Sequence, residues 1–267
     1  MMRLAISASE RLAWSEGLHL RPEKLALVLY DRIGGSEDDG RALARAAWSV
    51  RRMTSPIGAV STPSDLGDFL ETRRNGSPER DERPDFSSAP TPEDLSDWCT
   101  AMGSAKHLHP LVQAAMAWHL WRAWCLTDAD QRLEASVVAG RLAAHQQSVF
   151  FCLPVDPETG PGTDAPARLT RWLQAALTET NQSLAAIARV QEWRHRAFDA
   201  TGKLQGKGAP ALVDLIAGLP VVSAKVIAHE LSISTTQARH LIGRFEALDL
   251  VREMTGHSRF RFWTART

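Results

Sequence analysis

Apolar residues recur at helical spacing through most of the chain, and helix-start signals precede many of these runs. At Thr62-Pro63 and Thr91-Pro92 a capping residue stands before a first-turn proline, and an aspartate follows three residues after each threonine. Alternation typical of a strand is absent before residue 250. The pattern predicts helices opening at Pro22, over 37–53, after Thr62, after Thr91, over 108–126, from Thr127 to about Gln147, and over 166–199.

Three segments interrupt this helical pattern. Residues 73–94 are charged and rich in proline and serine, and residues 154–166 contain too many prolines and glycines for regular structure. Residues 199–210 are polar, hold three glycines and have the composition of a linker. We therefore expect a mostly α-helical protein with a helical bundle over 1–200 and a second domain over 201–267.

The second domain contains the stretch "SAKVIAHELSISTTQARHLIGRF" (223–245), which predicts two short helices joined by a tight corner. Ser223 and Ser234 are the expected N-caps. Apolar or small residues occupy the positions that a helix-turn-helix buries: Ile227, Ala228, Leu231, Ile233, Ala238 and Leu241. Ser232 departs from the pattern, because a glycine usually supplies the positive φ at this corner.

Polar and cationic residues lie on the outward face of the second helix and on the segment after it. "LVREMTGHSRFRFWTA" (250–265) predicts a β-hairpin wing, with Phe260 and Phe262 on one face and arginines on the other. A winged helix-turn-helix of this kind predicts contacts with double-stranded DNA. The candidate contacts are Thr235, Thr236, Gln237, Arg239, His240 and Arg244 on the helix, and His257, Arg259 and Arg261 on the wing.

Charge supports this interpretation only locally. Lys plus Arg equals Asp plus Glu at 31 each, so the whole chain is formally neutral. Basic residues nevertheless outnumber acidic ones after residue 202, where phosphates would be contacted. The longest apolar stretch is interrupted by His119 and Arg122, so we expect no membrane span or secretory peptide and a cytoplasmic protein.

Two stretches resemble Fic-related bacterial proteins. "LVDLIAGLPVVSAKVIAHELSIS" (212–234) with "FEALDLVREMTGHSRFRFW" (245–263) is similar to the C-terminal winged helix of an uncharacterised bacterial family that pairs a helical Fic-like region with a helix-turn-helix. "HPLVQAAMAWHLWRAW" (109–124) looks like the helix that precedes the Fic catalytic loop. The resemblance implies a Fic-like helical core followed by a DNA-binding domain.

The catalytic loop that the resemblance implies is missing. Fic enzymes transfer a nucleotide moiety with a loop of the form HPFxxGNGR, whose histidine is a general base and whose glycines and arginine hold phosphates. The corresponding stretch reads "CLTDADQRLEASVVAG" (125–140), with Cys125 near the histidine position and Arg132 as the one remnant. No catalytic residue is carried over, and we expect the protein not to be an enzyme.

Other candidate sites have simpler explanations. His107, His109 and His119 lie near Cys99 and Cys125, but no carboxylate or CxxC pair completes a metal site, and capping or core packing explains them equally well. Trp118, Trp121 and Trp124 form a stripe that favours core packing over a ligand pocket or dimer interface. We expect neither a metal nor a cofactor.

The sequence thus favours a DNA-binding protein, a transcriptional regulator with a catalytically inactive helical domain. Two alternatives remain: a protein-interaction adaptor on a degenerate Fic-like scaffold, and a nucleotidyl-transferring enzyme. A homodimer would suit DNA recognition, because two recognition helices about 34 Å apart enter successive major grooves. The helix over 166–199 is apolar on more than one side, as expected between layers or across subunits.

Overall fold

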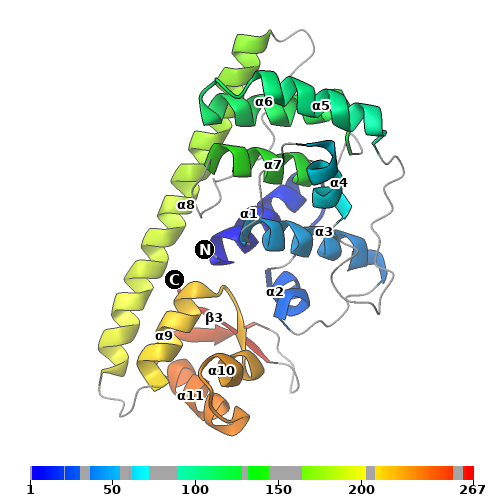
Figure 1. Cartoon of the computed structure of the whole chain (residues 1–267). Helices are drawn as coiled ribbons and strands as arrows, with labels where there is room; N and C mark the ends of the chain where they lie inside the picture. Colours follow the sequence, from blue (N-terminus) through cyan, green and yellow to red (C-terminus); the bar gives the residue numbers. More distant parts are fainter. Residues whose placement is uncertain are drawn as a thin grey trace. The chain divides into compact units, whose positions relative to one another are not determined.

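The computed structural model shows a mostly helical protein (Figure 1). It describes residues 2–20, 22–30, 37–54, 60, 62–71, 90–127, 132–144, 164–202, 208–254 and 261–267. The helices are α1 (Met2–Ser15), α2 (Pro22–Tyr30), α3 (Glu37–Thr54), α4 (Pro63–Glu71), α5 (Pro92–Ser104), α6 (Pro110–Ala123), α7 (Leu133–Ala144), α8 (Ala165–Thr201), α9 (Gly208–Gly218), α10 (Ala224–Glu230) and α11 (Thr235–Ala247). The strands are β1 (Val222–Ser223), β2 (Val251–Glu253) and β3 (Phe262–Ala265).

The chain forms two compact units. The C-terminal unit comprises Met1–Ile6, Arg21–Ile33 and Gln182–Thr267, and the helical unit comprises Ser7–Leu20 and Gly34–Asn181. Helix α8 continues to Thr201 and contributes to both units. Where independently folding domains begin and end therefore stays a prediction. Most of the segments 73–94 and 154–166 lies outside the described residues.

Local signals predicted several helix starts correctly. Thr91 caps α5 through its side chain, and the Asp94 carboxylate accepts from the Thr91 backbone N–H, so the capping box is complete. Hydrogen bonding to Thr91 holds the pKa of Asp94 below its ordinary value. Thr62 and Asp65 make the same reciprocal hydrogen bonds at α4. Helix α1, which the sequence pattern did not predict, lacks such a signal.

Three tryptophans form the centre of the helical unit. Trp98 of α5 and Trp121 of α6 pack edge to face with ring centroids 5.8 Å apart, and Trp118 precedes Trp121 by one turn. All three side chains are at most 1% exposed. Their indole N–H groups donate to Ala117 O, Ser136 Oγ and Thr127 Oγ1. The expected tryptophan stripe is therefore core packing, with Trp124 half-buried at the end of α6.

Helix α7 begins at Leu133, so the start expected at Thr127 is wrong. Thr127 is buried, and its hydroxyl accepts a hydrogen bond from Trp121. The carboxylate of Glu16 provides the cap, accepting from the backbone N–H of Leu133 at 2.8 Å. A cap that comes from so distant a segment leaves no local signal.

Arg45 of α3 joins α7 and the turn that follows α1 through a buried ion network. Its guanidinium contacts Glu16 at 2.7 Å and Glu134 at 2.9 Å. The side chain of Arg45 is 9% exposed, that of Glu16 is 4% exposed and that of Glu134 is 0% exposed. Burial alone would lower the pKa of Arg45, but Glu134 and Glu16 more than offset it, so the net shift is upward. Arg45 therefore stays charged and pairs with both carboxylates.

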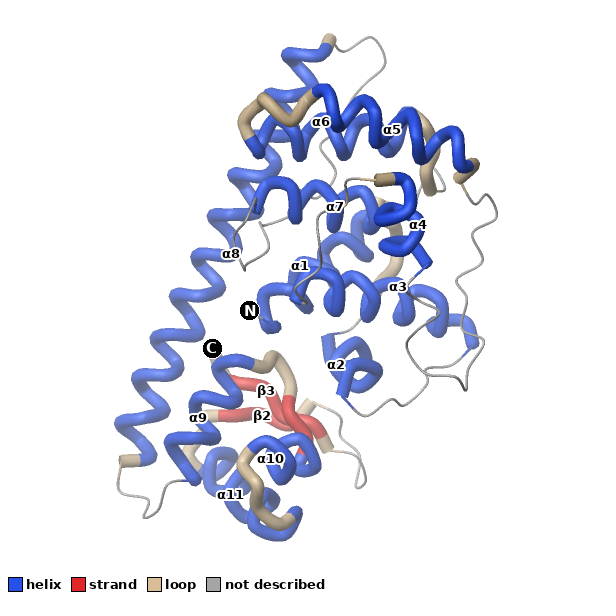
Figure 2. Tube along the Cα trace, in the orientation of Figure 1, coloured by secondary structure: helices blue, strands red, loops and turns tan. Residues whose placement is uncertain are grey.

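The C-terminal unit packs α9, α10 and α11 against a three-stranded antiparallel sheet (Figure 2). The strand order is β1-β3-β2, with Val222 opposite Trp263 and Val251 opposite Ala265. Strand β1 lies before residue 250, where no strand was expected, because two residues are too few for a visible alternation. The helix-turn-helix and the sheet together confirm the predicted fold class, a mostly α-helical protein with a C-terminal helix-turn-helix. The arrangement is consistent with a winged helix-turn-helix.

Arg3 ties α1 to the end of α9 within this unit. Its guanidinium donates to the carbonyl oxygens of Ile216 and Ala217, which the last turn of a helix leaves without partners, and to that of Leu219 just after α9. Burial lowers the pKa of Arg3 to about 10. The first turn of α1 therefore helps to fix the helix that precedes the helix-turn-helix.

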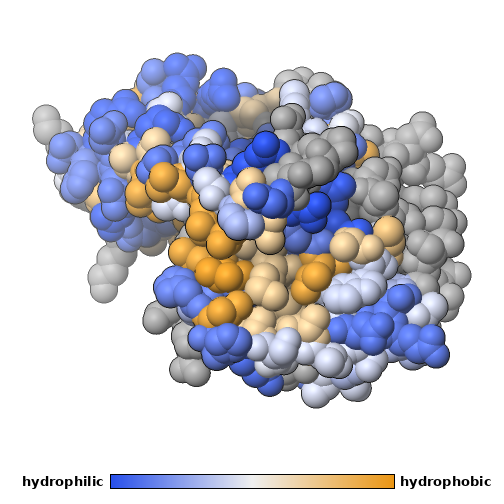
Figure 3. All heavy atoms as spheres, turned by 90° about the horizontal axis from the view of Figure 1, so that it is seen from above, coloured by the Kyte–Doolittle hydropathy of each residue, from blue (hydrophilic) through white to orange (hydrophobic). Residues whose placement is uncertain are grey.

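Hydrophilic residues cover much of the face shown in Figure 3, with hydrophobic residues gathered near its middle. Among the described residues, the exposed large hydrophobic side chains are Trp14, Leu177, Leu184 and Leu248. Two of these four belong to α8. Within the described ranges, no helix has the length and hydropathy needed to cross a membrane.

Replacing Arg45 with methionine is expected to lower the free energy of unfolding by about 3–5 kcal/mol. The substitution keeps most of the side-chain volume but removes the buried guanidinium that pairs with both Glu16 and Glu134. Urea denaturation followed by circular dichroism measures the loss.

Arg194→Met is the matched control, since Arg194 pairs with Asp214 at 2.8 Å with both side chains about half exposed. Such an exposed pair contributes about 0.2–1 kcal/mol. Equal losses of unfolding free energy for the two variants would show that the buried network stabilises the fold no more than an exposed ion pair does.

Candidate nucleic-acid interface

Both predicted N-caps of the helix-turn-helix are present. The Ser223 hydroxyl accepts from the backbone N–H of Val226 at 3.2 Å and starts α10. The Ser234 hydroxyl accepts from the backbone N–H of Gln237 at 3.2 Å and starts α11. Each cap satisfies a helix N–H that would otherwise lack a partner, so the sequence itself fixes where both helices begin.

The corner between α10 and α11 has the strained backbone that the sequence indicated. Ser232 adopts a φ of +53°, in the left-handed region where a glycine would fit without a steric cost. Leu231 and Ile233 on either side of it pack against the core of the unit. The corner therefore has the expected conformation, although a serine occupies the glycine position.

Burial of one side of α11 determines which residues face outward. Ala238, Ile242 and Phe245 are at most 1% exposed and join the core. The six candidate residues predicted on this helix are all exposed: Thr235, Thr236, Gln237, Arg239, His240 and Arg244. Whether they contact DNA stays a prediction.

The middle of the exposed face is occupied by small and neutral residues. Thr236, His240, Gly243 and Ala247 follow one another at spacings of four, three and four, so they share the line opposite the buried side. Arg239 and Arg244 flank this line on opposite sides. A Cβ on Gly243 would meet nothing within 4 Å, so the fold does not require a glycine here.

Gln237 is partly committed to the fold. Its Oε1 accepts from the backbone N–H of Ser234 at 2.9 Å and lies 3.1 Å from the Ser234 hydroxyl. Bidentate recognition of adenine by glutamine needs both an acceptor and a donor. While the capping box is closed, only the Nε2 donor of Gln237 remains for a ligand.

The residues predicted on the wing are only partly described. His257 and Arg259 lie outside the described residues. Arg261 forms ion pairs with Glu253 on β2 and, at 3.5 Å, with Glu246 on α11, and its guanidinium lies 5.0 Å from the Trp263 ring centroid. The hydrogen bond to Glu253 raises the pKa of Arg261 above its ordinary value. Arg261 is thus a link between wing and helix before any ligand binds.

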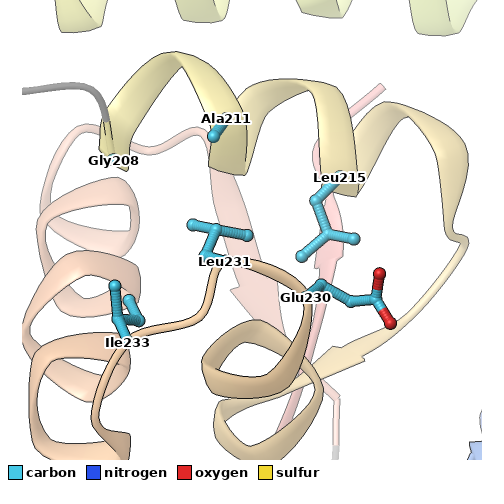
Figure 4. Close-up of a pocket in the computed structure, with 6 residues that line it drawn as sticks. All are labelled: Gly208, Ala211, Leu215, Glu230, Leu231 and Ile233. Atoms are coloured by element: carbon cyan, nitrogen blue, oxygen red, sulfur yellow. The ribbon is translucent and has the colours of Figure 1, made fainter.

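A small pocket and an open groove lie on the described surface of this unit. A small pocket between α11 and β3 is lined by Arg239, Ile242, Gly243, Glu246, Arg261 and Trp263. An open groove lies between α9 and the corner, where Leu215, Leu231 and Ile233 line the space (Figure 4). The groove is mostly apolar, with the carboxylate of Glu230 at its edge.

One of the histidines considered for a metal site caps a helix. His109 is the N-cap of α6, because its Nδ1 accepts from the backbone N–H of Leu111 at 3.2 Å. Burial lowers the pKa of His119 and raises that of the Cys99 thiol. In the part of the chain that the structure describes, no three His, Cys, Asp or Glu residues come together as metal ligands would.

Sequence reasoning missed Glu246 and Gly243. Both line the pocket between α11 and β3. Along α11, Gly243 follows Arg239 by four residues and Glu246 follows Gly243 by three. The helical spacing therefore placed them on one side of α11, but the wing strand that faces them could not be positioned from the sequence.

Two helices joined at a tight corner and backed by a small antiparallel sheet define a helix-turn-helix domain. Residues 209–265, from the first turn of α9 to the end of β3, match a protein-family model described as "HTH DNA binding domain". The C-terminal region of the chain is therefore a helix-turn-helix domain of the DNA-binding type.

One curated relative extends beyond this domain. The chain is 25% identical over 180 residues to the "Uncharacterized protein y4cF" of Sinorhizobium fredii (strain NBRC 101917 / NGR234). The similarity covers 63% of this chain and 46% of that protein. The chain thus spans about half the length of the curated relative that it matches.

Substitutions at the two serines of the corner are expected to act in opposite directions. Ser232→Gly removes the left-handed strain and raises the free energy of unfolding by up to about 1 kcal/mol, part of the gain being offset by the flexibility of glycine in the unfolded chain. Thermal and urea denaturation of the full chain measure the change.

Ser234→Ala removes the cap of α11 and lowers the same free energy by about 1 kcal/mol. Because both serines are exposed and only two residues apart, loss of a hydroxyl as such cannot explain opposite signs. Changes of the same sign would contradict the roles assigned to the corner.

Proposed function

We propose that the protein binds double-stranded DNA through α11 and acts as a transcriptional regulator. The observation that carries the proposal is the exposed face of α11, where Arg239, His240 and Arg244 are free of carboxylate partners among the described residues. In helix-turn-helix proteins the second helix enters the major groove. A face with cations on its flanks suits that groove, since the phosphates lie along its two edges.

The arrangement on α11 suggests a division of roles. Thr236 and His240 on the central line are placed to meet base edges, and Gly243 and Ala247 leave room for the helix to approach the groove closely. Arg239 and Arg244 reach sideways to phosphates or to guanines. Thr235 and the Nε2 donor of Gln237 lie in the first turn, where a helix presents free backbone N–H groups to an anion.

Electrostatics around α11 favours a polyanion as the ligand. Glu246 is the one acidic residue in α11, and Arg261 pairs with it and with Glu253. This pairing offsets the negative charge beside the recognition face. His257 and Arg259 remain predicted contacts of the wing with the DNA backbone or minor groove.

The apolar groove of Figure 4 favours a second candidate function, in which the domain docks a protein partner as an adaptor. In that case binding would depend on Leu215 and Ile233 and not on the cations of α11. The Fic-like origin of the helical unit, its lack of catalysis and a cytoplasmic location stay predictions that accompany either function.

Arg239→Ala and Arg244→Ala are each expected to weaken duplex binding several-fold. Each substitution should also lower the slope of log K against log salt by about 1, because one phosphate contact is lost. Duplexes selected from a random library serve as the ligand, and fluorescence anisotropy at several salt concentrations gives affinity and slope.

Arg189→Ala is the control, since Arg189 is an exposed arginine on α8 and the charge change is the same. An unchanged affinity and slope for both α11 variants would remove these arginines from the interface. A loss that is equal in the control would indicate a general charge effect.

Arg261 is expected to act through its carboxylates and not through a phosphate. Arg261→Gln removes the cation that pairs with Glu246 and Glu253 beside the recognition face, so duplex affinity should fall through repulsion. A triple variant that also carries Glu246→Gln and Glu253→Gln should recover the affinity and the salt slope of the unmodified protein.

The triple variant decides between the two roles by the same anisotropy titration. If Arg261 contacts a phosphate directly, removal of the two carboxylates does not replace that contact. Affinity would then stay low, and the salt slope would stay reduced by about 1.

A further inference from the structure

Helix α8 carries a short line of exposed residues that includes two leucines. Leu177, Asn181, Leu184 and Ala188 are all exposed, and we call these four residues the outer seam. The two leucines are 60% and 57% exposed. The spacings of four, three and four residues match the a and d positions of a heptad, with leucine at both d positions.

The outer seam lies opposite the side of α8 that the fold buries. Ala176, Glu179, Ser183 and Trp193 are at most 5% exposed and occupy c and f positions of the same heptad. Internal packing therefore does not need the leucines of the outer seam. Helix α8 presents two faces, one covered by the chain itself and one without a partner in the described residues.

The chemistry of the outer seam differs from that of a solvated helix face. From Leu173 to Ala188 the a, d, e and g positions hold no charged residue. The e and g positions carry Leu173, Thr178, Thr180, Ala185 and Ile187. A neutral strip of this kind offers a polyanion or a charged peptide no electrostatic attraction, whereas a copy of itself meets no like-charge repulsion.

We propose that the outer seam pairs with the outer seam of a second copy of this chain in a parallel, in-register two-stranded coil. In that arrangement each residue meets its own counterpart across a two-fold axis. Leu177 and Leu184 then cover their counterparts, which removes exposed apolar surface from water.

Asn181 is the residue that favours this occupant over others. Its exposed amide has no hydrogen-bond partner among the described residues and lies between the two leucines. Gln174 and Asn181 occupy successive a positions, and an asparagine at an a position favours one register and two-stranded association, because two facing amides satisfy each other's donor and acceptor. The asparagine weakens the coil but selects the in-register pair.

The inference goes beyond the proposed function and does not depend on it. What the dimer would mean for DNA recognition does depend on the proposed function. A two-fold axis along α8 relates two copies of α11, as a target with inverted half-sites requires. The test therefore uses the full chain without DNA, so that failure of the dimer and failure of DNA binding are separate results.

Sedimentation equilibrium of the full chain over about 1–100 µM should show a reversible monomer–dimer equilibrium. Leu177→Asp combined with Leu184→Asp should leave the helical circular dichroism unchanged and weaken association by at least about 100-fold. Trp14→Asp is the control, because Trp14 is 61% exposed and lies outside α8. A wild-type chain that stays monomeric, or equal weakening in the control, overturns the proposal.

Cysteine cross-linking then tests orientation in a chain whose Cys99, Cys125 and Cys152 are replaced by serine. Asn181→Cys and Ala188→Cys, made separately, should both form disulfide-linked dimers at least about 10-fold faster than Gln182→Cys, which is exposed beside the seam. An antiparallel pair brings at most one of the two positions together. Fast cross-linking at only one of them, or at neither, overturns the parallel pairing.

Discussion

Burial of Ala238, Ile242 and Phe245 is the constraint on which the rest of the C-terminal unit depends. A helix that buries one side must expose the other, so these three residues set the rotation of α11. The rotation places Thr236, His240 and Gly243 outermost and moves the two arginines to the flanks. The core beneath the helix thus decides which side chains a ligand can reach, and the caps at Ser223 and Ser234 decide where along the chain that face begins.

Much of this unit could be predicted from the sequence because its determinants are local. The helix-turn-helix apolar positions, the serine caps and the departure at Ser232 are each defined within a few residues, and each is present in the structure. The capping boxes of α4 and α5 were found for the same reason. The DNA-type domain is likewise supported by the family match over 209–265.

Features that depend on distant partners could not be predicted. The cap of α7 comes from Glu16, and the end of α9 is held by Arg3, so neither helix end shows in its own sequence. Arg261 looked like a free cation on the wing, yet its neighbours in space are Glu246 and Glu253. Of α8, the sequence showed that apolar residues occur on more than one side. Only the structure shows that the c and f side is buried and that the outer seam is not.

The electrostatics of α11 connects the two proposals. The chain is formally neutral overall, and α11 contributes only Arg239 and Arg244 as permanent cations. Counter-ion release grows with the number of phosphates neutralised, so one copy of so small a cationic face binds weakly at physiological salt. In the proposed dimer, a second copy linked through α8 doubles the contacts, and the second half-site then binds at a high effective concentration. Under the two proposals, dimer formation and duplex binding strengthen each other, because each stabilises the same two-fold assembly.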